Sequence, residues 1–412
     1  MRRRVPRRRL LATAVLLAAA ALAPAALPAT AAPVPVPDPA AVSAPASARH
    51  GGERCPEGDA LPAATTARLD STVERVRRQA GIPGLVVGIW MPGKGCYVRA
   101  TGVADKRTGE PMSADGYIRI GSETKTFTVT ALLRLVDEGK VGLDDPVDDY
   151  VRGVPNGRNI TLRHLAEMRS GLFPYTSDPG FVHDLLSAPK RPFNPWEVLS
   201  YGYRHANTSA PDTTFQYSNT NLVLLGLVVE KVTGRPLAEV LHEDVVRPAG
   251  LRHTFLPKGA EFPRPHARGY TDQTLTGAVA DATNWNPSWA WSAGAMISDL
   301  DDLRRWAPVL AKGKLLSPAT QAQRMKTLPT GFPGTSYGLG ILDTNGWIGH
   351  NGSLPGYETV TVYLPSQKAT LVLMLTTDSL SGGQEPSTLV ARAVTGIITP
   401  QNVYASSVTP RG

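Results

Sequence analysis

Ser122 and Lys125 lie three residues apart and could form a nucleophile with its base. They fall in Arg119–Asp137, whose apolar residues recur at helical spacing, so both side chains project from one face of the expected helix. A serine hydroxyl needs an adjacent base, and an amine can serve if burial or a positive neighbour lowers its pKa. The start of a helix adds free backbone N–H groups. The apolar face of this helix is expected to contain Phe127, Leu132, Leu135 and Val136.

The Ser-x-x-Lys pattern is weak evidence by itself, because the chain contains it twice. The second copy, Ser187–Lys190, has a proline inside and lies in a proline-rich stretch, where a helical face is not expected. A capping serine beside a solvated lysine would also explain the first copy. Partners elsewhere in the chain must therefore decide.

Tyr217 and Asn219 come directly before an apolar run, 222–229, that reads as a buried helix. A phenol can transfer a proton if a nearby lysine charge lowers its pKa. An amide can hold a substrate carbonyl. The structural alternative is a hydrogen-bonded core tyrosine and an asparagine cap.

The segment His350–Ser353 begins a strand-rich region near the C-terminus. Gly352 would let substrate lie close to the strand edge. The backbone N–H of Ser353 could join that of Ser122 as an oxyanion hole. The side chains of His350, Asn351 and Ser353 supply donors, although a lone histidine is more often structural.

Two rival sites are rejected. Gly334–Gly338 fits Gly-x-Ser-x-Gly, with Asp343 and His350 following in order. That nucleophile elbow needs a strand before it and a helix after it, and here all three residues crowd into fifteen positions. Metal-ligand spacing is missing too, since His242-Glu243 has no second histidine four residues on. Neither a metal nor a cofactor is expected.

Residues 1–32 read as an export signal, with six arginines in the first nine residues and then an apolar run that Pro24 interrupts. The run is short for a membrane span, so no stable anchor is expected. The chain is +8 overall, but removing six of 43 basic residues leaves 37 against 35 acidic ones, or +2. Nucleic acid is therefore not the expected partner.

Residues 33–64 are rich in Pro, Ala, Ser and Gly and read as a flexible linker. Cys55 and Cys96 are the only cysteines, and export favours a disulfide between them. One large domain is expected over 65–399, with a tail at 400–412. Strands expected at both ends of this domain flank a helical middle at about 144–285. The fold class is therefore α+β, an antiparallel sheet with an inserted helical lobe. The expected strands are Gly84–Met91, Cys96–Val103, Trp347–Ile348, Thr359–Tyr363 and Leu371–Leu375.

Together, Ser-x-x-Lys, Tyr-x-Asn and His-x-Gly occur in the order typical of the penicillin-recognising serine hydrolases. The chain most resembles exported D-alanyl-D-alanine carboxypeptidases of the actinobacterial type and class C β-lactamases. Three further stretches agree with this resemblance: Ile160–Leu172, Trp289–Ser298 and Tyr337–Gly340.

The resemblance implies a site between a sheet-helix lobe and a helical lobe. It makes Ser122 the acylated nucleophile, Lys125 its base and Tyr217 the group that handles the leaving group. Asn219 would bind the substrate amide, and His350 would stand where many relatives have lysine. The substrate carboxylate would lie against Asn351 and Ser353, and the pocket would be lined by Trp289.

The implied reaction is removal of terminal D-alanine from peptidoglycan peptides, with β-lactams as acylating partners. Alternatives are a β-lactamase, an esterase or D-amino-acid peptidase, and a non-catalytic penicillin-binding protein. Two departures matter. Ile341–Asn345 lacks the arginine that carboxypeptidases carry there, and Met168 replaces a residue that is often histidine. The oligomeric state is not indicated.

Overall fold

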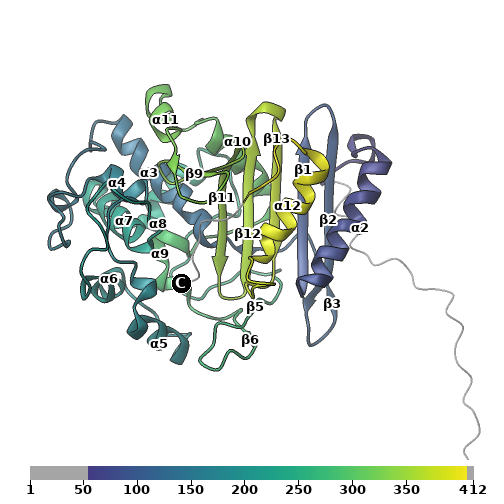
Figure 1. Ribbon diagram of the computed structural model, residues 1–412, viewed down its shortest axis with the longest axis horizontal. Coiled ribbons are helices and arrows are strands. Elements are labelled where there is room, and N and C mark those ends of the chain that lie inside the picture. The colour runs from purple at the N-terminus through teal and green to yellow at the C-terminus, as the bar shows by residue number, and fades with distance from the viewer. Residues whose placement is uncertain (1–53, 406–412) are drawn as a thin grey trace, which may run out of the picture. The chain divides into compact units, whose positions relative to one another are not determined.

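The computed structural model describes residues 54–405, and within them nine strands form one antiparallel sheet. The strand order is β3-β2-β1-β13-β12-β11-β10-β9-β8 (Figure 1). The strands are β1 Gly84–Met91, β2 Gly95–Asp105, β3 Glu110–Pro111, β8 Leu328–Pro329, β9 Thr335–Tyr337, β10 Leu342–Thr344, β11 Trp347–Leu354, β12 Tyr357–Leu364 and β13 Ala369–Leu375. Because β1 pairs with β13, both ends of the domain build the sheet, and the predicted fold class is confirmed.

Helices cover both faces of this sheet (Figure 1). Over residues 54–405 they are α2 Ala63–Gln79, α3 Thr124–Asp137, α4 Leu162–Ala166, α5 Pro179–Ser187, α6 Pro195–Tyr203, α7 Asn219–Thr233, α8 Leu237–Val240, α9 Trp291–Gly294, α10 Leu300–Ala311, α11 Pro318–Arg324 and α12 Pro386–Ile398. One face packs against α2 and α12, and the other against α10. Helices α4 to α9 form the lobe beside β11. Two short pairs, β4 (Ile118–Arg119) with β7 (Ile297–Ser298) and β5 (Tyr270–Thr271) with β6 (Ala280–Asp281), complete the strands.

The α2/α12 face is apolar at alternate strand positions, as the two-residue period of a strand requires. Val360 and Val362 of β12 and Leu373 of β13 share a buried cluster with Leu69 of α2 and Val390 of α12. The opposite strand positions, such as Thr359 and Thr361 of β12, face the turn that carries Ser122, where Thr359 Oγ1 donates to Ile120 O at 3.2 Å. The sheet therefore separates an apolar layer from the layer that holds the candidate site.

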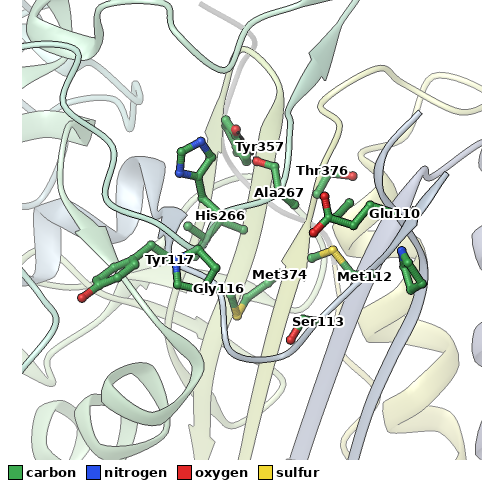
Figure 2. A pocket seen from close by; sticks show the side chains of 14 residues that line it. Glu110, Met112, Ser113, Gly116, Tyr117, His266, Ala267, Tyr357, Met374 and Thr376 are labelled. Carbon is green, nitrogen blue, oxygen red and sulfur yellow. Dashed lines mark hydrogen bonds between the residues drawn. The ribbon is translucent and has the colours of Figure 1, made fainter. Parts of the chain in front are cut away.

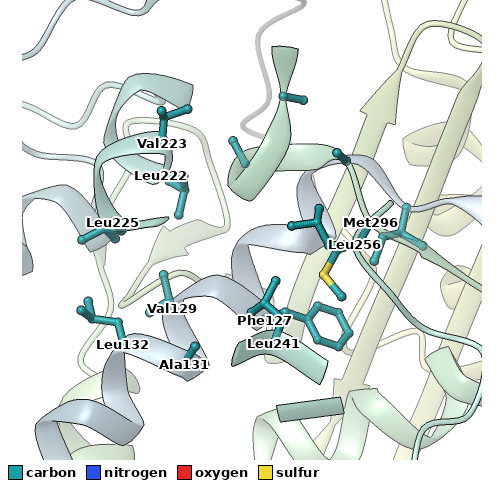
Figure 3. Close-up of a cluster of buried hydrophobic side chains, with 14 of the residues drawn as sticks. Phe127, Val129, Ala131, Leu132, Leu222, Val223, Leu225, Leu241, Leu256 and Met296 are labelled. Atoms are coloured by element: carbon teal, nitrogen blue, oxygen red, sulfur yellow. The ribbon is translucent and has the colours of Figure 1, made fainter. Parts of the chain in front are cut away.

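Helix α3 is buried on nearly all sides rather than on the single face expected from its apolar spacing. Only Arg134, Val136 and Asp137 are not fully buried. A helix enclosed all round lies in the interior of a fold. Its side chains pack against the helical lobe in Figure 3, and its threonines bond to neighbouring backbone, as Thr128 Oγ1 does to Ser292 O at 2.7 Å.

The predicted linker and tail are shorter than expected where the structure describes them. Helix α2 begins at Ala63, inside the predicted linker, and Tyr404 of the predicted tail is buried against the α2/α12 layer. Cys55 and Cys96 form a disulfide that joins the segment before α2 to β2. The predicted signal segment 1–32, the linker up to 53 and the tail from 406 lie outside the described residues. Among residues 54–405, none of the helices has the length and apolar character needed to cross a bilayer.

Candidate active site

Ser122 lies in a short 3₁₀ turn, Gly121–Glu123, that leads directly into α3. The residue before this turn, Ile120, is held by a backbone hydrogen bond. Its N–H donates to the carbonyl of Met296, just before β7, at 3.0 Å. Ser122 is only 7% exposed. Ser122 therefore lies at the start of a helix, as expected from the sequence.

Lys125 is fully buried in the first turn of α3, and its Nζ contacts three oxygen atoms. These are Ser122 Oγ at 3.0 Å, Asn219 Oδ1 at 2.7 Å and the backbone oxygen of Ala293 at 2.7 Å. Asn219 begins α7 and Ala293 belongs to α9. Three segments distant in sequence thus meet at one amine.

Burial lowers the pKa of Lys125 well below its usual value. A neutral amine has two N–H donors and one lone pair. Amide and carbonyl oxygens can only accept, so the two N–H groups point to Asn219 and Ala293. The lone pair is left for the Ser122 hydroxyl, which then donates to it. This arrangement lets Lys125 remove the serine proton.

The Tyr217 ring lies beside Lys125, with Nζ 4.8 Å from the ring centroid. Its buried hydroxyl makes no hydrogen bond of good geometry, although the nearby Ser122 hydroxyl acts to lower its pKa. Burial dominates and raises the pKa of Tyr217 well above its usual value. The expected lowering of this pKa by a lysine charge does not occur, because burial disfavours a charge on Lys125 and desolvation of the phenol dominates. Tyr217 is therefore a proton donor in the resting site.

His350 is buried in β11, and its ring contacts Tyr337 rather than the Ser122–Lys125 pair. Nδ1 lies 2.5 Å from Asn351 O, and Nε2 lies 3.1 Å from the Tyr337 hydroxyl. A carbonyl can only accept, so Nδ1 carries the proton and Nε2 accepts from Tyr337. Burial is the main cause that lowers the pKa of His350 to about 3. His350 is thus neutral and does not reproduce the charge of a lysine.

Gly352 and Gly121 allow β11 to pack directly against the nucleophile turn. A Cβ added to Gly352 would lie 1.9 Å from Ile120 O, and one added to Gly121 would lie 2.6 Å from Ser353 N. Gly121 also has φ of +52°, which favours glycine. The missing side chain at Gly352 therefore makes room for the turn, not for substrate as expected. It also brings the Ser353 backbone close to the turn that carries Ser122.

Of the expected substrate-binding side chains, that of Asn351 lies elsewhere, and the pocket-lining role of Trp289 stays a prediction. Neighbouring residues of a strand point to opposite faces, so Asn351 points away from the face of His350. Its Nδ2 donates to Glu385 Oε2 at 3.3 Å, just before α12. Trp289 packs against Phe181 in the helical lobe, and its carbonyl accepts the hydroxyl of Tyr175 at 2.7 Å. Ser353 shares the strand face of Asn351, which leaves its backbone as the part near the nucleophile.

Sequence reasoning missed three groups around the nucleophile. The Ala293 carbonyl and the Tyr337 hydroxyl lie in the stretches Trp289–Ser298 and Tyr337–Gly340, whose likeness to the family was the available signal. Glu123 follows the nucleophile and is buried beside Thr359 and Thr361. Burial raises its carboxyl pKa to about 8, although both hydroxyls lower it. No pattern in the sequence distinguished this glutamate from a solvated one.

Two hollows lie away from Ser122. The first, of about 50 Å³, lies under the segment before β4 and is lined by Met112, Tyr117 and Met374 among others (Figure 2). The second, of about 460 Å³, adjoins it through shared residues, and its charged lining includes Arg264 and Arg268. Neither contains a serine–lysine pair. Within residues 54–405, no cluster of three or more His, Cys, Asp or Glu side chains could hold a metal ion.

Comparison with known proteins agrees with this geometry. Residues 69–395 match the family described as Beta-lactamase. Esterase EstB of Burkholderia gladioli is 29% identical over 380 residues, covering 80% of this chain and 95% of the esterase.

Two solved structures share the fold over nearly their whole length. A D-stereospecific amidohydrolase from Streptomyces sp. has a TM-score of 0.72 at 29% identity and covers 81% of this chain and 99% of its own. The D-amino acid amidase from Ochrobactrum anthropi SV3, complexed with L-phenylalanine, has a TM-score of 0.71 at 28% identity, covering 82% and 98%. The family match spans more than half of the 412 residues, so this chain belongs to the beta-lactamase family and has its serine hydrolase fold.

We expect Gly352→Ala to slow acylation of Ser122 by about 100-fold, because the new methyl group must displace the nucleophile turn by about 1 Å. Acylation can be followed with a fluorescent penicillin or a chromogenic ester. Gly396→Ala in α12 is the matched control, since a Cβ there meets nothing within 4 Å. Equal rates in wild type and Gly352→Ala would contradict the packing described here.

The neutral state of His350 predicts a pH-dependent stability. Its pKa is lowered from 6.5 to about 3 on folding. Between these values the unfolded chain binds a proton that the folded chain does not, so the free energy of unfolding falls as pH falls through this window. The slope is at most about 1.4 kcal/mol per pH unit for one group. Urea unfolding of wild type and His350→Gln from pH 7 to 4 should show this extra loss only in wild type, and parallel curves would exclude it.

Proposed function

We propose that this chain hydrolyses amides and esters of D-amino acids through an acyl-enzyme on Ser122. One observation carries the proposal: the buried amine of Lys125 is aligned between Ser122 Oγ, Asn219 Oδ1 and the Ala293 carbonyl. The similarity to a D-stereospecific amidohydrolase and a D-amino acid amidase over nearly their full length supports the substrate class. The similarity to an esterase supports esters as alternative acyl donors.

Acylation begins when the Lys125 amine takes the Ser122 proton and Oγ bonds to the substrate carbonyl carbon. The carbonyl oxygen becomes an oxyanion, for which the backbone N–H groups of Ser122 and Ser353 are the proposed donors. As the C–N bond breaks, the Tyr217 hydroxyl protonates the leaving amine and regains a proton from the Lys125 ammonium. Asn219 orients both the amine and the substrate amide.

Deacylation reverses these proton transfers. A water molecule attacks the acyl carbon while its proton passes to the Tyr217–Lys125 pair. The bond from Ser122 Oγ to the acyl carbon breaks, and Oγ recovers a proton. The products are a D-amino acid and the free amine or alcohol.

The charges around Ser122 favour an acyl donor without a terminal carboxylate. His350 is neutral, and burial disfavours a charge on Lys125. Arg324 is buried near Tyr337, but its Nη2 donates to Thr126 O and Thr130 Oγ1 and its Nε to Leu339 O. Removal of D-alanine from D-Ala-D-Ala peptides, the reaction implied by the family resemblance, needs a cation for that carboxylate. It is therefore the second candidate, and β-lactam hydrolysis is the third.

The decisive test measures amide hydrolysis with D- and L-substrates, in the wild type and in variants of Ser122 and Ser187. Purified protein should release ammonia from D-phenylalanine amide much faster than from its L-isomer, and Ser122→Ala should lower this rate by about 10⁴-fold or more. Tyr217→Phe should lower it by about 100-fold. Ser187→Ala, at the second Ser-x-x-Lys copy, is the matched control and should leave the rate unchanged.

D-alanine release from a D-Ala-D-Ala peptide without amidase activity would favour the carboxypeptidase. Rapid nitrocefin hydrolysis alone would favour the lactamase. A mass shift from fluorescent penicillin on a serine other than Ser122 would sink the assignment of the nucleophile.

We further propose that the protein is exported. The support is the arginine-rich leader with its apolar run, together with a disulfide, which persists in oxidising compartments. The secreted form should begin near residue 32 by mass spectrometry of the culture medium. Full-length protein found only inside cells would contradict export.

A further inference from the structure

Met168 lies where the segment after α4 passes beneath the loop that carries Tyr217. Its side chain is fully buried, and its backbone has φ of +60°, which is unusual for a residue with a side chain. Many family members have histidine at the position of Met168. The proposed reaction assigns it no role.

The contacts of Met168 flank Tyr217 on both sides. Its carbonyl accepts the Gln216 N–H at 2.8 Å, and its Sδ accepts the Ser218 N–H at 3.4 Å. The same sulfur accepts from Asn221 Nδ2 at 3.7 Å, in the first turn of α7. One residue therefore holds the backbone before and after the phenol and the helix turn that begins with Asn219.

Ser170 makes a second contact between the segment after α4 and the first turn of α7. Ser170 Oγ donates to Asn221 Oδ1 at 2.7 Å and accepts the Leu172 N–H at 3.1 Å. Ser218 and Asn221 are both buried, so a polar group there that loses its partner is costly. A thioether is a weak acceptor, but it is the group that receives both donors.

We propose that Met168 is a positioning residue for the reaction proposed above, its thioether fixing the Tyr217 loop and the Asn219 turn against Lys125. The sulfur touches neither Lys125 nor the nucleophile in any contact of this structure. Its effect reaches the chemistry through Ser218 and Asn221. A shift of this loop moves the proton donor Tyr217 and one of the three oxygen atoms that orient the Lys125 amine.

Three variants separate this role from simple packing. Leucine conserves the volume of methionine, and this exchange is among the best tolerated in protein cores, but leucine has no acceptor. Glutamine keeps the unbranched shape and returns an acceptor oxygen. Met374→Leu is the matched control, because Met374 is a buried methionine of β13 that lines the small hollow of Figure 2.

With D-phenylalanine amide as substrate, Met168→Leu should lower kcat by about tenfold or more while KM changes by less than about twofold, as expected for misplaced catalytic groups. Met168→Gln should recover most of the lost kcat, and Met374→Leu should match wild type. Thermal unfolding of all three checks that each variant is folded.

Wild-type kcat in a folded Met168→Leu would overturn the inference while leaving the proposed function intact. Equal losses in Met168→Leu and Met168→Gln would also overturn it, since packing alone would then explain them. An inactive wild-type enzyme would instead remove the proposed function, and this inference with it.

Discussion

The burial of Lys125 is the constraint on which the site depends. An amine taken out of water must either find oxygen partners or give up its charge, and here both occur. Ser122 Oγ comes from the turn before α3, Asn219 Oδ1 from α7 and the Ala293 carbonyl from α9. The helical lobe and the nucleophile turn must therefore meet correctly for the amine to be satisfied. The same contacts leave its lone pair directed at the serine.

The sheet fixes the other side of this arrangement through backbone contact. Gly352 of β11 and Gly121 of the nucleophile turn lie very close together. A Cβ atom on either residue would clash with the backbone of the other segment. Direct backbone packing leaves little freedom, so the Ser122 turn cannot shift without moving the strand. Tyr337 and the Asn351 carbonyl then hold His350 as a neutral ring beside Tyr217. Preorganised neutral dipoles of this kind can stabilise developing charge without rearranging during the reaction.

Side-chain patterns predicted the α+β fold. The meeting of Ser122, Lys125, Tyr217 and Asn219 was implied by the family resemblance, which three motifs in the typical order carry. The Ala293 carbonyl could not be predicted in this way, since every residue has one and only the fold decides which is used. The pKa of Tyr217 depends on burial, which a local pattern does not reveal. The orientation of Asn351 was accessible in principle, because strand alternation already places it opposite His350.

Membership of the beta-lactamase family does not by itself define the substrate, because one fold can host several chemistries. The local charge is more informative. Ile341–Asn345 has no arginine, and Arg324 cannot replace it, because turning toward substrate would break its bonds to α3 and to Leu339. Those bonds to backbone and hydroxyl oxygens satisfy a buried guanidinium, and burial already lowers its pKa to about 9. Arg324 is held in the core and His350 is neutral, so neither supplies a cation for a terminal carboxylate. This is the physical ground for proposing an amide or ester substrate, whose polar groups Asn219 and the nearby backbone would satisfy.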